Sequence, residues 1–91
     1  MNLLHPNKPQ EFFKNQGLSD LVKAFLDHYV ETLEGENPPF GLYDIIISEV
    51  EKPLFLKILE LCKGNQKQAA AILGIHRNTL RRKMVDYGMT A

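Results

Sequence analysis

Apolar residues recur at helical spacing in two segments of the first two-thirds of the chain. Residues 18–34 carry them three and four positions apart, and Gly35 then suits the C′ position of a helix. A second apolar pattern covers residues 42–62, and Pro53 inside it predicts a kink, because its ring removes one backbone donor and crowds a carbonyl. The ENPPFG segment between them cannot continue a helix. The pattern predicts two helices joined by a loop.

The second of these helices is apolar on nearly every face. A short run, residues 45–47, could form a strand by itself, but the length and charges around it favour a helix. A helix that is apolar all round must be buried all round. Four helices in a chain of 91 residues cannot enclose their own longest member. We therefore expect a homodimer in which residues 18–62 of two chains interlock in an antiparallel bundle. The alternative is a compact monomer with this helix at its centre.

The last part of the chain, residues 63–91, contains two shorter helical patterns on either side of Gly74. Glycine tolerates the positive φ that a tight turn requires. Ala70 lies four residues before the glycine, where two steeply crossing helices need a small side chain. Leu80, six residues after it, would fill the gap between the helices, and either Asn65 or Gln66 can cap the first one. The spacing predicts a helix-turn-helix.

The second helix of this motif separates apolar from polar side chains. Leu80, Met84 and Tyr87 form one apolar stripe that faces inward. Arg77 falls in the first turn, where a recognition helix contacts base edges, and His76 or Asn78 could contribute there. The other side carries Asn78, Arg81, Arg82 and Asp86. The pattern favours DNA binding, and the alternative is an ordinary amphipathic hairpin whose charges are only solvated.

The charge is unevenly distributed along the chain, although the formal total is zero. Residues 1–51 contain three basic and nine acidic side chains, a balance of −6. Residues 52–91 contain eight basic and two acidic side chains, a balance of +6. Phosphate binding requires such a local excess of positive charge and not a basic total. The acidic half would repel DNA and so help to orient its approach.

Composition bounds the remaining classes of function. The length predicts one small domain, or a domain with a tail, and no apolar run approaches the ~18 residues of a membrane span. The first ten residues lack the apolar region of a secretory signal. Cys62 is the only cysteine and lies in an apolar stretch, so we expect a core residue in a reducing cytoplasm. The histidines His5, His28 and His76 show no ligand spacing with Cys62 or the carboxylates, so we expect no metal site and no cofactor. The sequence also shows no combination of residues typical of an active site, so we expect no enzymatic activity.

Three segments resemble the Fis family of bacterial nucleoid-associated DNA-binding proteins. They are LYDIIISEVEKPL (residues 42–54), KGNQKQAAAILGIHRNTLRRK (63–83) and YGM (87–89). The C-terminal DNA-binding domains of NtrC-type activators share the second segment. The similarity continues upstream to about Leu18, through the dimerisation helices, which favours the Fis family. The resemblance implies an all-α fold with four helices per chain, in an intertwined homodimer with a helical-bundle core and a C-terminal helix-turn-helix.

The resemblance also assigns roles to single residues. In the family the arginine after the turn, here Arg77, contacts a guanine at the edge of the site, which agrees with the bidentate preference of arginine. His76 replaces a family asparagine beside it and is the second candidate for base contact. Asp86 replaces a lysine, which removes a flanking phosphate contact. The implied phosphate-binding residues are Asn65, Lys67 (a threonine in the family), Thr79, Arg81, Arg82 and Lys83. Asn78 and Gln66 are additional candidates for contact with DNA.

The family's recognition helices are closer together than one turn of B-DNA, about 34 Å. Such a dimer must bend the duplex, so the resemblance implies a transcriptional regulator in the bacterial nucleoid that prefers A·T-rich centres with flanking guanines. RNA polymerase or a recombinase would be further partners. The alternatives are an α-helical module for protein–protein interaction and a stand-alone relative of the DNA-binding domains of NtrC-type activators.

Residues 1–17 are expected to form a flexible arm, about nine residues shorter than the arm with which family members contact DNA invertases. Pro6 and Pro9 disfavour a regular strand ladder in it. Phe12 and Phe13 could either contact a partner or fold back on the bundle. The sequence therefore gives no ground for assigning recombination enhancement to this chain.

Overall fold

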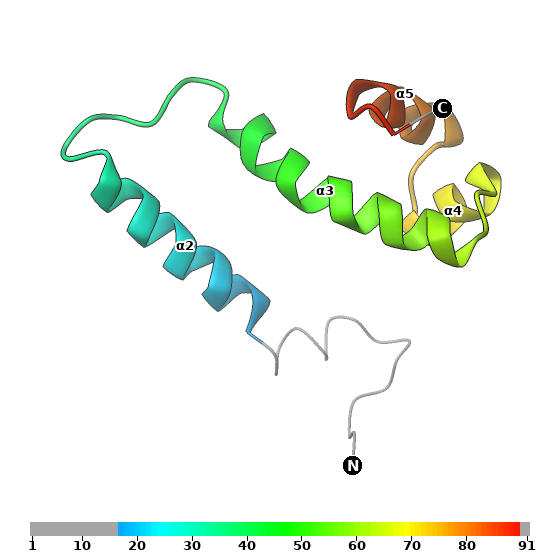
Figure 1. Cartoon of the computed structure of the whole chain (residues 1–91), viewed down its shortest axis with the longest axis horizontal. Coiled ribbons are helices and arrows are strands. Elements are labelled where there is room, and N and C mark those ends of the chain that lie inside the picture. The colour runs from blue at the N-terminus through cyan, green and yellow to red at the C-terminus, as the bar shows by residue number, and fades with distance from the viewer. Residues whose placement is uncertain (1–16, 90–91) are drawn as a thin grey trace, which may run out of the picture. The chain divides into compact units, whose positions relative to one another are not determined.

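The computed structural model describes residues 17–89, and all of its regular structure in that range is helical (Figure 1). The helices are α2 (Leu18–Thr32), α3 (Leu42–Leu61), α4 (Gln66–Leu73) and α5 (Arg77–Asp86). The all-α class and the four predicted helices are therefore confirmed. The proposed arm, apart from Gly17, lies outside the described residues. The chain divides into two units, residues 1–40 and 41–91.

Helix α2 ends two residues earlier than the sequence predicted. Its last turn tightens into bonds three residues apart, since the Leu33 N–H donates to the Val30 carbonyl at 3.1 Å and the Glu34 N–H to the Glu31 carbonyl at 3.2 Å. Glu34 takes the left-handed conformation with φ 52°, ahead of Gly35 with φ 88°. The C′ residue is thus Glu34, and the predicted glycine follows it.

No residue of α2 is buried within its unit. Its apolar side chains lie along an open surface, and Leu21 is 67% and Phe25 55% exposed. The Phe25 and Tyr29 rings stack in parallel with 6.2 Å between their centroids. Helix α2 therefore presents an apolar stripe that nothing in the described part of its own unit covers.

Helix α3 runs through Pro53 without a break, and the kink there stays a prediction. It ends at Leu61, one residue before the predicted end, because Cys62 is already the capping residue. Beyond it, Lys63 is left-handed with φ 54°, its N–H donates to the Glu60 carbonyl at 3.1 Å, and the Gly64 N–H donates to the Leu59 carbonyl at 2.9 Å. This pair of bonds is a Schellman motif, which satisfies the last carbonyls of α3.

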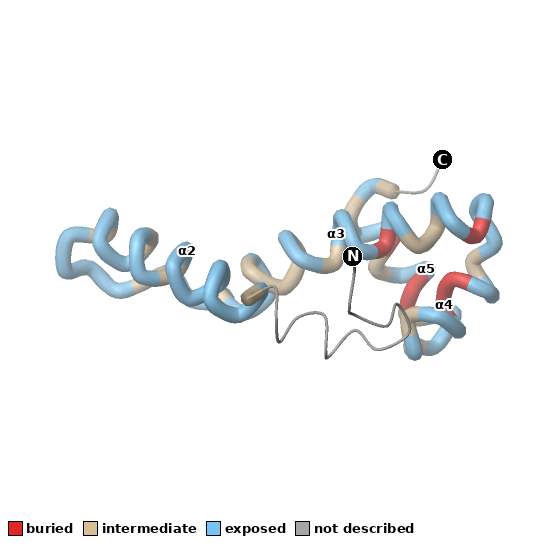
Figure 2. The backbone as a smooth tube through the Cα atoms, turned by 90° about the horizontal axis from the view of Figure 1, so that it is seen from below, coloured by how far each residue is buried: buried red, intermediate tan, exposed pale blue. Residues whose placement is uncertain are grey.

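The core of the second unit lies where α3, α4 and α5 meet, and Figure 2 shows buried positions on these three helices. Ala69 and Leu80 are 0% exposed, and Ala70 is 3% exposed, so small residues do form the crossing that Leu80 fills. Gly74 ends α4 with φ 76°, and its N–H donates to the Ala70 carbonyl at 2.8 Å. The predicted turn geometry is confirmed. Cys62, 7% exposed, belongs to this core as expected.

The first half of α3 contributes little to that core. Phe55 is the buried residue of the helix, whereas Tyr43, Ile45 and Val50 are about half exposed or more. The described part of one chain therefore does not bury α3 on all sides, in agreement with the expectation that four helices cannot enclose it. Within residues 17–89, none of the helices combines the length and hydropathy needed to cross a membrane.

Candidate nucleic-acid interface

Helix α4 begins at a side-chain cap. The Asn65 Oδ1 accepts a hydrogen bond from the Gln68 N–H at 3.0 Å, with the Asn65 backbone extended. Of the two residues that the sequence left open as the cap, the structure selects Asn65, and Gln66 is the first helical residue. The Asn65 amide nitrogen still carries donors for a phosphate, whereas its oxygen satisfies a helix N–H that would otherwise lack a partner.

Helix α5 begins at a cap that the sequence did not predict. The His76 Nδ1 accepts a hydrogen bond from the Asn78 N–H at 3.0 Å. A neutral imidazole whose Nδ1 accepts must carry its proton on Nε2. The exposed ring therefore offers only an Nε2–H donor to a ligand, and not the donor and acceptor that the residue type alone would allow. The signal was available, because His76 immediately precedes the helix, but histidine is a weak capping residue.

Helix α5 is fixed by one side and carries cations on another. Leu80 and Met84 anchor it in the core at 0% and 5% exposure. Arg77, Arg81 and Arg82 are all exposed. Arg77 occupies the first turn, where the helix dipole adds positive potential. Lys67 of α4 and Asn78 are exposed as well, while Thr79 is half-buried and Asp86 adds an exposed negative charge.

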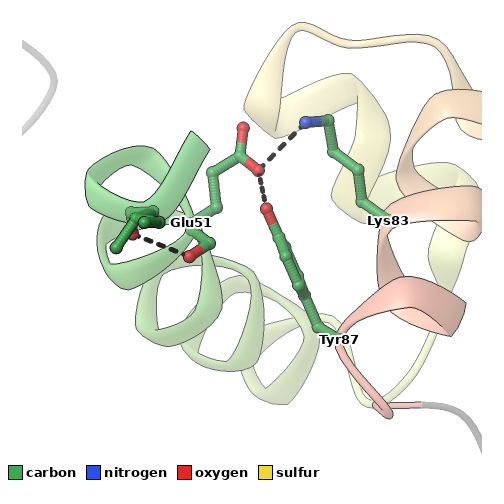
Figure 3. Close-up of polar contacts among 5 residues, drawn as sticks. Glu51, Lys83 and Tyr87 are labelled. Carbon is green, nitrogen blue, oxygen red and sulfur yellow. Dashed lines mark hydrogen bonds and ion pairs between the residues drawn. The ribbon is translucent and has the colours of Figure 1, made fainter. Parts of the chain in front are cut away.

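Lys83, the last candidate for phosphate contact, is engaged inside the molecule (Figure 3). Its Nζ lies 3.0 Å from the Glu51 Oε1, and the Tyr87 hydroxyl donates a hydrogen bond to the same oxygen. The side chains of Lys83 and Glu51 are 31% and 20% exposed. Sequence reasoning missed this contact, because Glu51 lies 32 residues before Lys83 and no periodicity connects them.

Two further side chains of α3 contact Tyr87. The Lys52 Nζ lies 5.7 Å from the centroid of the Tyr87 ring, within range of a cation–π interaction. The Phe55 ring packs on the same tyrosine, with centroids 6.3 Å apart and the planes tilted by 40°. Tyr87, which follows the last residue of α5, is thus the point at which this end of the helix-turn-helix meets α3.

The contacts shift the pKa of both acidic partners. Partial burial acts to raise the pKa of Glu51, but the hydrogen bonds from Tyr87 and Lys83, together with the Lys83 charge, bring it below the ordinary value. The hydrogen bond to Glu51, followed by desolvation and the Glu51 charge, raises the pKa of Tyr87 to about 12. At neutral pH the carboxylate is therefore charged and the phenol protonated, which is the state in which both contacts form.

An open cleft of about 560 Å³ lies between the first half of α3 and α5. Its walls mix both signs of charge, from Asp44, Glu51, Arg82 and Asp86. Within residues 17–89, no three side chains of histidine, cysteine, aspartate or glutamate are grouped to hold a metal ion. Three exposed cations suited to a polyanion, Lys67, Arg77 and Arg81, lie outside this lining.

The comparisons with known proteins cover both the helix-turn-helix and α3. Residues 46–87 match the family described as "Bacterial regulatory protein, Fis family". The chain is 45% identical to the DNA-binding protein Fis of Mannheimia haemolytica over 75 residues, 82% of this chain and 76% of that protein. It is 40% identical to a putative Fis-like DNA-binding protein of Neisseria meningitidis over 72 residues, 79% of this chain and 90% of that protein.

A third relative is the DNA-binding protein Fis of Vibrio cholerae, 41% identical over 80 residues, 88% of this chain and 81% of that protein. These lengths extend the similarity well beyond the helix-turn-helix, as the sequence predicted. The resemblance is confirmed, and this chain belongs to the Fis family.

Proposed function

We propose that this protein is a homodimeric DNA-binding regulator whose α5 enters the major groove. The observation that carries the proposal is the division of α5 into two sides. Leu80 is completely buried, whereas Arg77, Arg81 and Arg82 are exposed on the same short helix. A helix held rigidly by its apolar side can present its cations at fixed positions. The names of the three relatives, each of them a DNA-binding protein, support it.

Arg77 and His76 are the residues that we assign to base contact. Arg77 lies in the first turn of α5 and can donate two hydrogen bonds to guanine O6 and N7. His76 offers its Nε2–H to an acceptor on the neighbouring base, since its Nδ1 caps the helix. Asn78 and Gln66 lie in the first turns of α5 and α4 and are additional candidates.

Phosphate contacts would surround the base contacts. Lys67, Arg81 and Arg82 are exposed cations, and they supply charge without sequence information. Asn65 and Thr79 add polar donors close to the starts of α4 and α5. The contact with Glu51 weakens the phosphate role that the resemblance implies for Lys83, because the carboxylate offsets the charge of the ammonium and uses one of its donors.

The dimer is supported by apolar surface that one chain leaves open. In α2 this surface includes Leu21 and Phe25, and in α3 it includes Tyr43 and Ile45. A second copy is the economical cover for both, and it would supply two recognition helices for two half-sites. Helices closer together than a turn of DNA would bend the duplex and favour A·T-rich centres. RNA polymerase or a recombinase as further partners, and a place in the bacterial nucleoid, belong to the same proposal.

Substitution of single arginines tests the assignment. Arg77→Ala should abolish the preference for a flanking guanine, which corresponds to about 1–3 kcal/mol of discrimination. Arg82→Ala is the matched control, because it should weaken binding to all sequences about equally. The measurement is a gel shift over duplexes that differ only at the flanking base. A gel shift that is sensitive to DNA bending, run on duplexes with different central sequences, then tests whether the protein bends its site. Unchanged guanine preference in Arg77→Ala would contradict the base-contacting role.

The exposed apolar stripe of α2 also favours a second candidate, a module that docks another protein through its helices. The two functions differ in their response to DNA. Failure of the purified chain to shift an A·T-rich duplex of about three helical turns at low salt would favour the interaction module.

A further inference from the structure

Lys83 and Tyr87 are four residues apart at the end of α5, so they lie on successive turns and on one face. Both donate a hydrogen bond to the same oxygen, the Oε1 of Glu51 on α3 (Figure 3). Ammonium and phenol thus converge on one carboxylate from a helix that begins 26 residues after it in the chain. Such a convergence fixes the position of the two side chains relative to α3.

These side chains add to the core contacts of Leu80 and Met84 in placing α5. Helix α4 is the element whose backbone lies close to both α3 and α5. The direct link between α3 and α5 is made by side chains, with Glu51, Lys52 and Phe55 of α3 around Tyr87. Side chains that hold a helix in this way set its angle, although they do not contact the ligand themselves.

The same interaction changes which cations are free for DNA. The Lys83 ammonium is 3.0 Å from a carboxylate, and only 31% of its side chain is exposed. Glu51 already takes one of the three Lys83 donors and offsets its positive charge, so a phosphate gains less from Lys83 than from the exposed guanidinium groups of Arg81 and Arg82. The lowered pKa of Glu51 keeps the competing carboxylate charged at neutral pH.

We propose that Glu51 is a positioning residue for the recognition helix and that it retains Lys83 as an internal cation, so that Lys83 makes no phosphate contact. The proposal rests on the DNA-binding function proposed above. It gives an acidic residue of α3 a role in recognition. Glu51 offsets one positive charge of α5, that of Lys83, which would attract phosphates of any sequence. It also holds Arg77 at a defined angle to the base edges.

The salt dependence of DNA binding separates Lys83 from a true phosphate ligand. Log K falls linearly with log salt, and each neutralised phosphate adds about 0.9 to the magnitude of this slope, which is the quantity compared between the variants. Lys83→Gln should leave the slope of the full chain unchanged. The matched control, Arg82→Gln on the same helix, should lower it by about 0.9 for each phosphate that is no longer neutralised, and twice that in a dimer. An equal decrease of the slope in both variants would overturn the proposal.

Release of Lys83 is the complementary experiment. In Glu51→Gln the amide oxygen can still accept the Tyr87 hydrogen bond, but the charge that holds Lys83 is gone. The slope should then increase by about 0.9 for each released lysine. Adding Lys83→Gln to this variant should cancel the increase. An unchanged slope in Glu51→Gln would contradict the retention of Lys83, and a merely structural role of Glu51 would not produce an increase that the second substitution removes.

Tyr87→Phe tests the positioning role separately. The ring that packs on Phe55 stays, but the hydroxyl that donates to Glu51 is removed. We expect an unchanged salt slope together with weaker discrimination of the flanking guanine. Wild-type discrimination in this variant would overturn the positioning role. A thermal melt followed by circular dichroism confirms that each variant is folded.

A measurement without DNA keeps this proposal distinct from the proposed function. The pKa of Tyr87, raised to about 12, should fall in Glu51→Gln. The difference in phenolate absorbance between the two proteins reports it, since Tyr29 and Tyr43 are common to both. If the wild-type chain fails to bind DNA although the titration shifts as expected, the proposed function fails and the Glu51 interaction stands. A tyrosine titration identical in both proteins would instead remove the interaction on which this inference depends.

Discussion

Helix α2 and the α4–α5 pair have similar amphipathic patterns but very different surroundings. The 15 residues of α2 include no buried residue, whereas the eight of α4 and the ten of α5 include two each (Figure 2). A helix becomes buried only where another apolar face is available. The helix-turn-helix finds that face within its own chain. Helix α2 has the same kind of face, and no described residue of its own unit covers it.

Helix α3 combines a half that packs in the core of its own chain with a half that is left exposed. Its second half gives Phe55 to the core of the helix-turn-helix, and Cys62 follows at its end. Its first half leaves Tyr43, Ile45 and Val50 exposed. One part of the molecule should therefore be stable by itself, and the other should gain stability in proportion to the association of chains. Substitutions in each part test whether the two really differ in this way.

Leu80→Ala should have the largest effect. Leu80 is 0% exposed at the centre of the crossing between α4 and α5, and a buried leucine truncated to alanine costs about 2–5 kcal/mol. The measurement is the free energy of unfolding in urea, at several protein concentrations. Leu61→Ala is the matched control, because Leu61 is 67% exposed at the end of α3. A loss in Leu80→Ala that is no greater than in the control would refute a self-contained core.

Leu21→Ala should have the next largest effect, and only where chains associate. A leucine of this kind contributes about 1.5–3 kcal/mol when it becomes fully buried, although Leu21 is 67% exposed in one chain. We expect the loss of melting temperature to grow with protein concentration and sedimentation to show weaker dimers. Lys23→Ala, on the same helix with a largely exposed side chain, is the control. A loss that does not depend on concentration would contradict the homodimer.

The sequence predicted the parts of the fold that depend on neighbours in the chain. Gly74, Ala70 and Leu80 are within ten residues of one another, so a short pattern contained the whole turn. The end of α2 was wrong by two residues, because Glu34 adopts a left-handed conformation that its residue type disfavours.

Contacts between distant residues were not predictable in the same way. Glu51 was counted with the acidic half of the chain, but its partners Lys83 and Tyr87 follow 32 and 36 residues later. No repeat or motif marks such a pair, since it forms only after three helices have packed. For the candidate interface, the sequence therefore predicted the exposed arginines well and the environment of Lys83 poorly.

Asn65→Ala should have a smaller effect than either leucine substitution. It removes the bond from the Gln68 N–H to the Asn65 Oδ1, and loss of such a cap costs about 1 kcal/mol. Asn78→Ala is the matched control, because Asn78 is an exposed residue inside α5 and its N–H, which is part of the backbone, stays available to His76. The free energy of unfolding compares the two. A greater loss in Asn78→Ala would show that the cap of α4 contributes little to the self-contained part of the molecule.

The smallest expected effect is the acid response of the Glu51 interaction, which joins α3 to the helix-turn-helix. The pKa of Glu51 is below its ordinary value of 4.5 in the folded chain, so the unfolded chain takes up this proton first as the pH falls. The resulting stabilisation is complete above about pH 4.5 and is lost as the pH falls through the folded pKa. The stability advantage of the wild type over Glu51→Gln should therefore shrink in this window.

Glu49→Gln provides the control, because Glu49 is exposed on the same helix. Unfolding in urea at a series of pH values from neutral to acid measures all three proteins. An advantage over Glu51→Gln that persists unchanged to the lowest pH would mean that the carboxylate charge does not hold α5 in place. The side of α5 that faces α3 would then be held by the core and by the packing of Phe55 and Lys52 on Tyr87, without a contribution from the carboxylate charge.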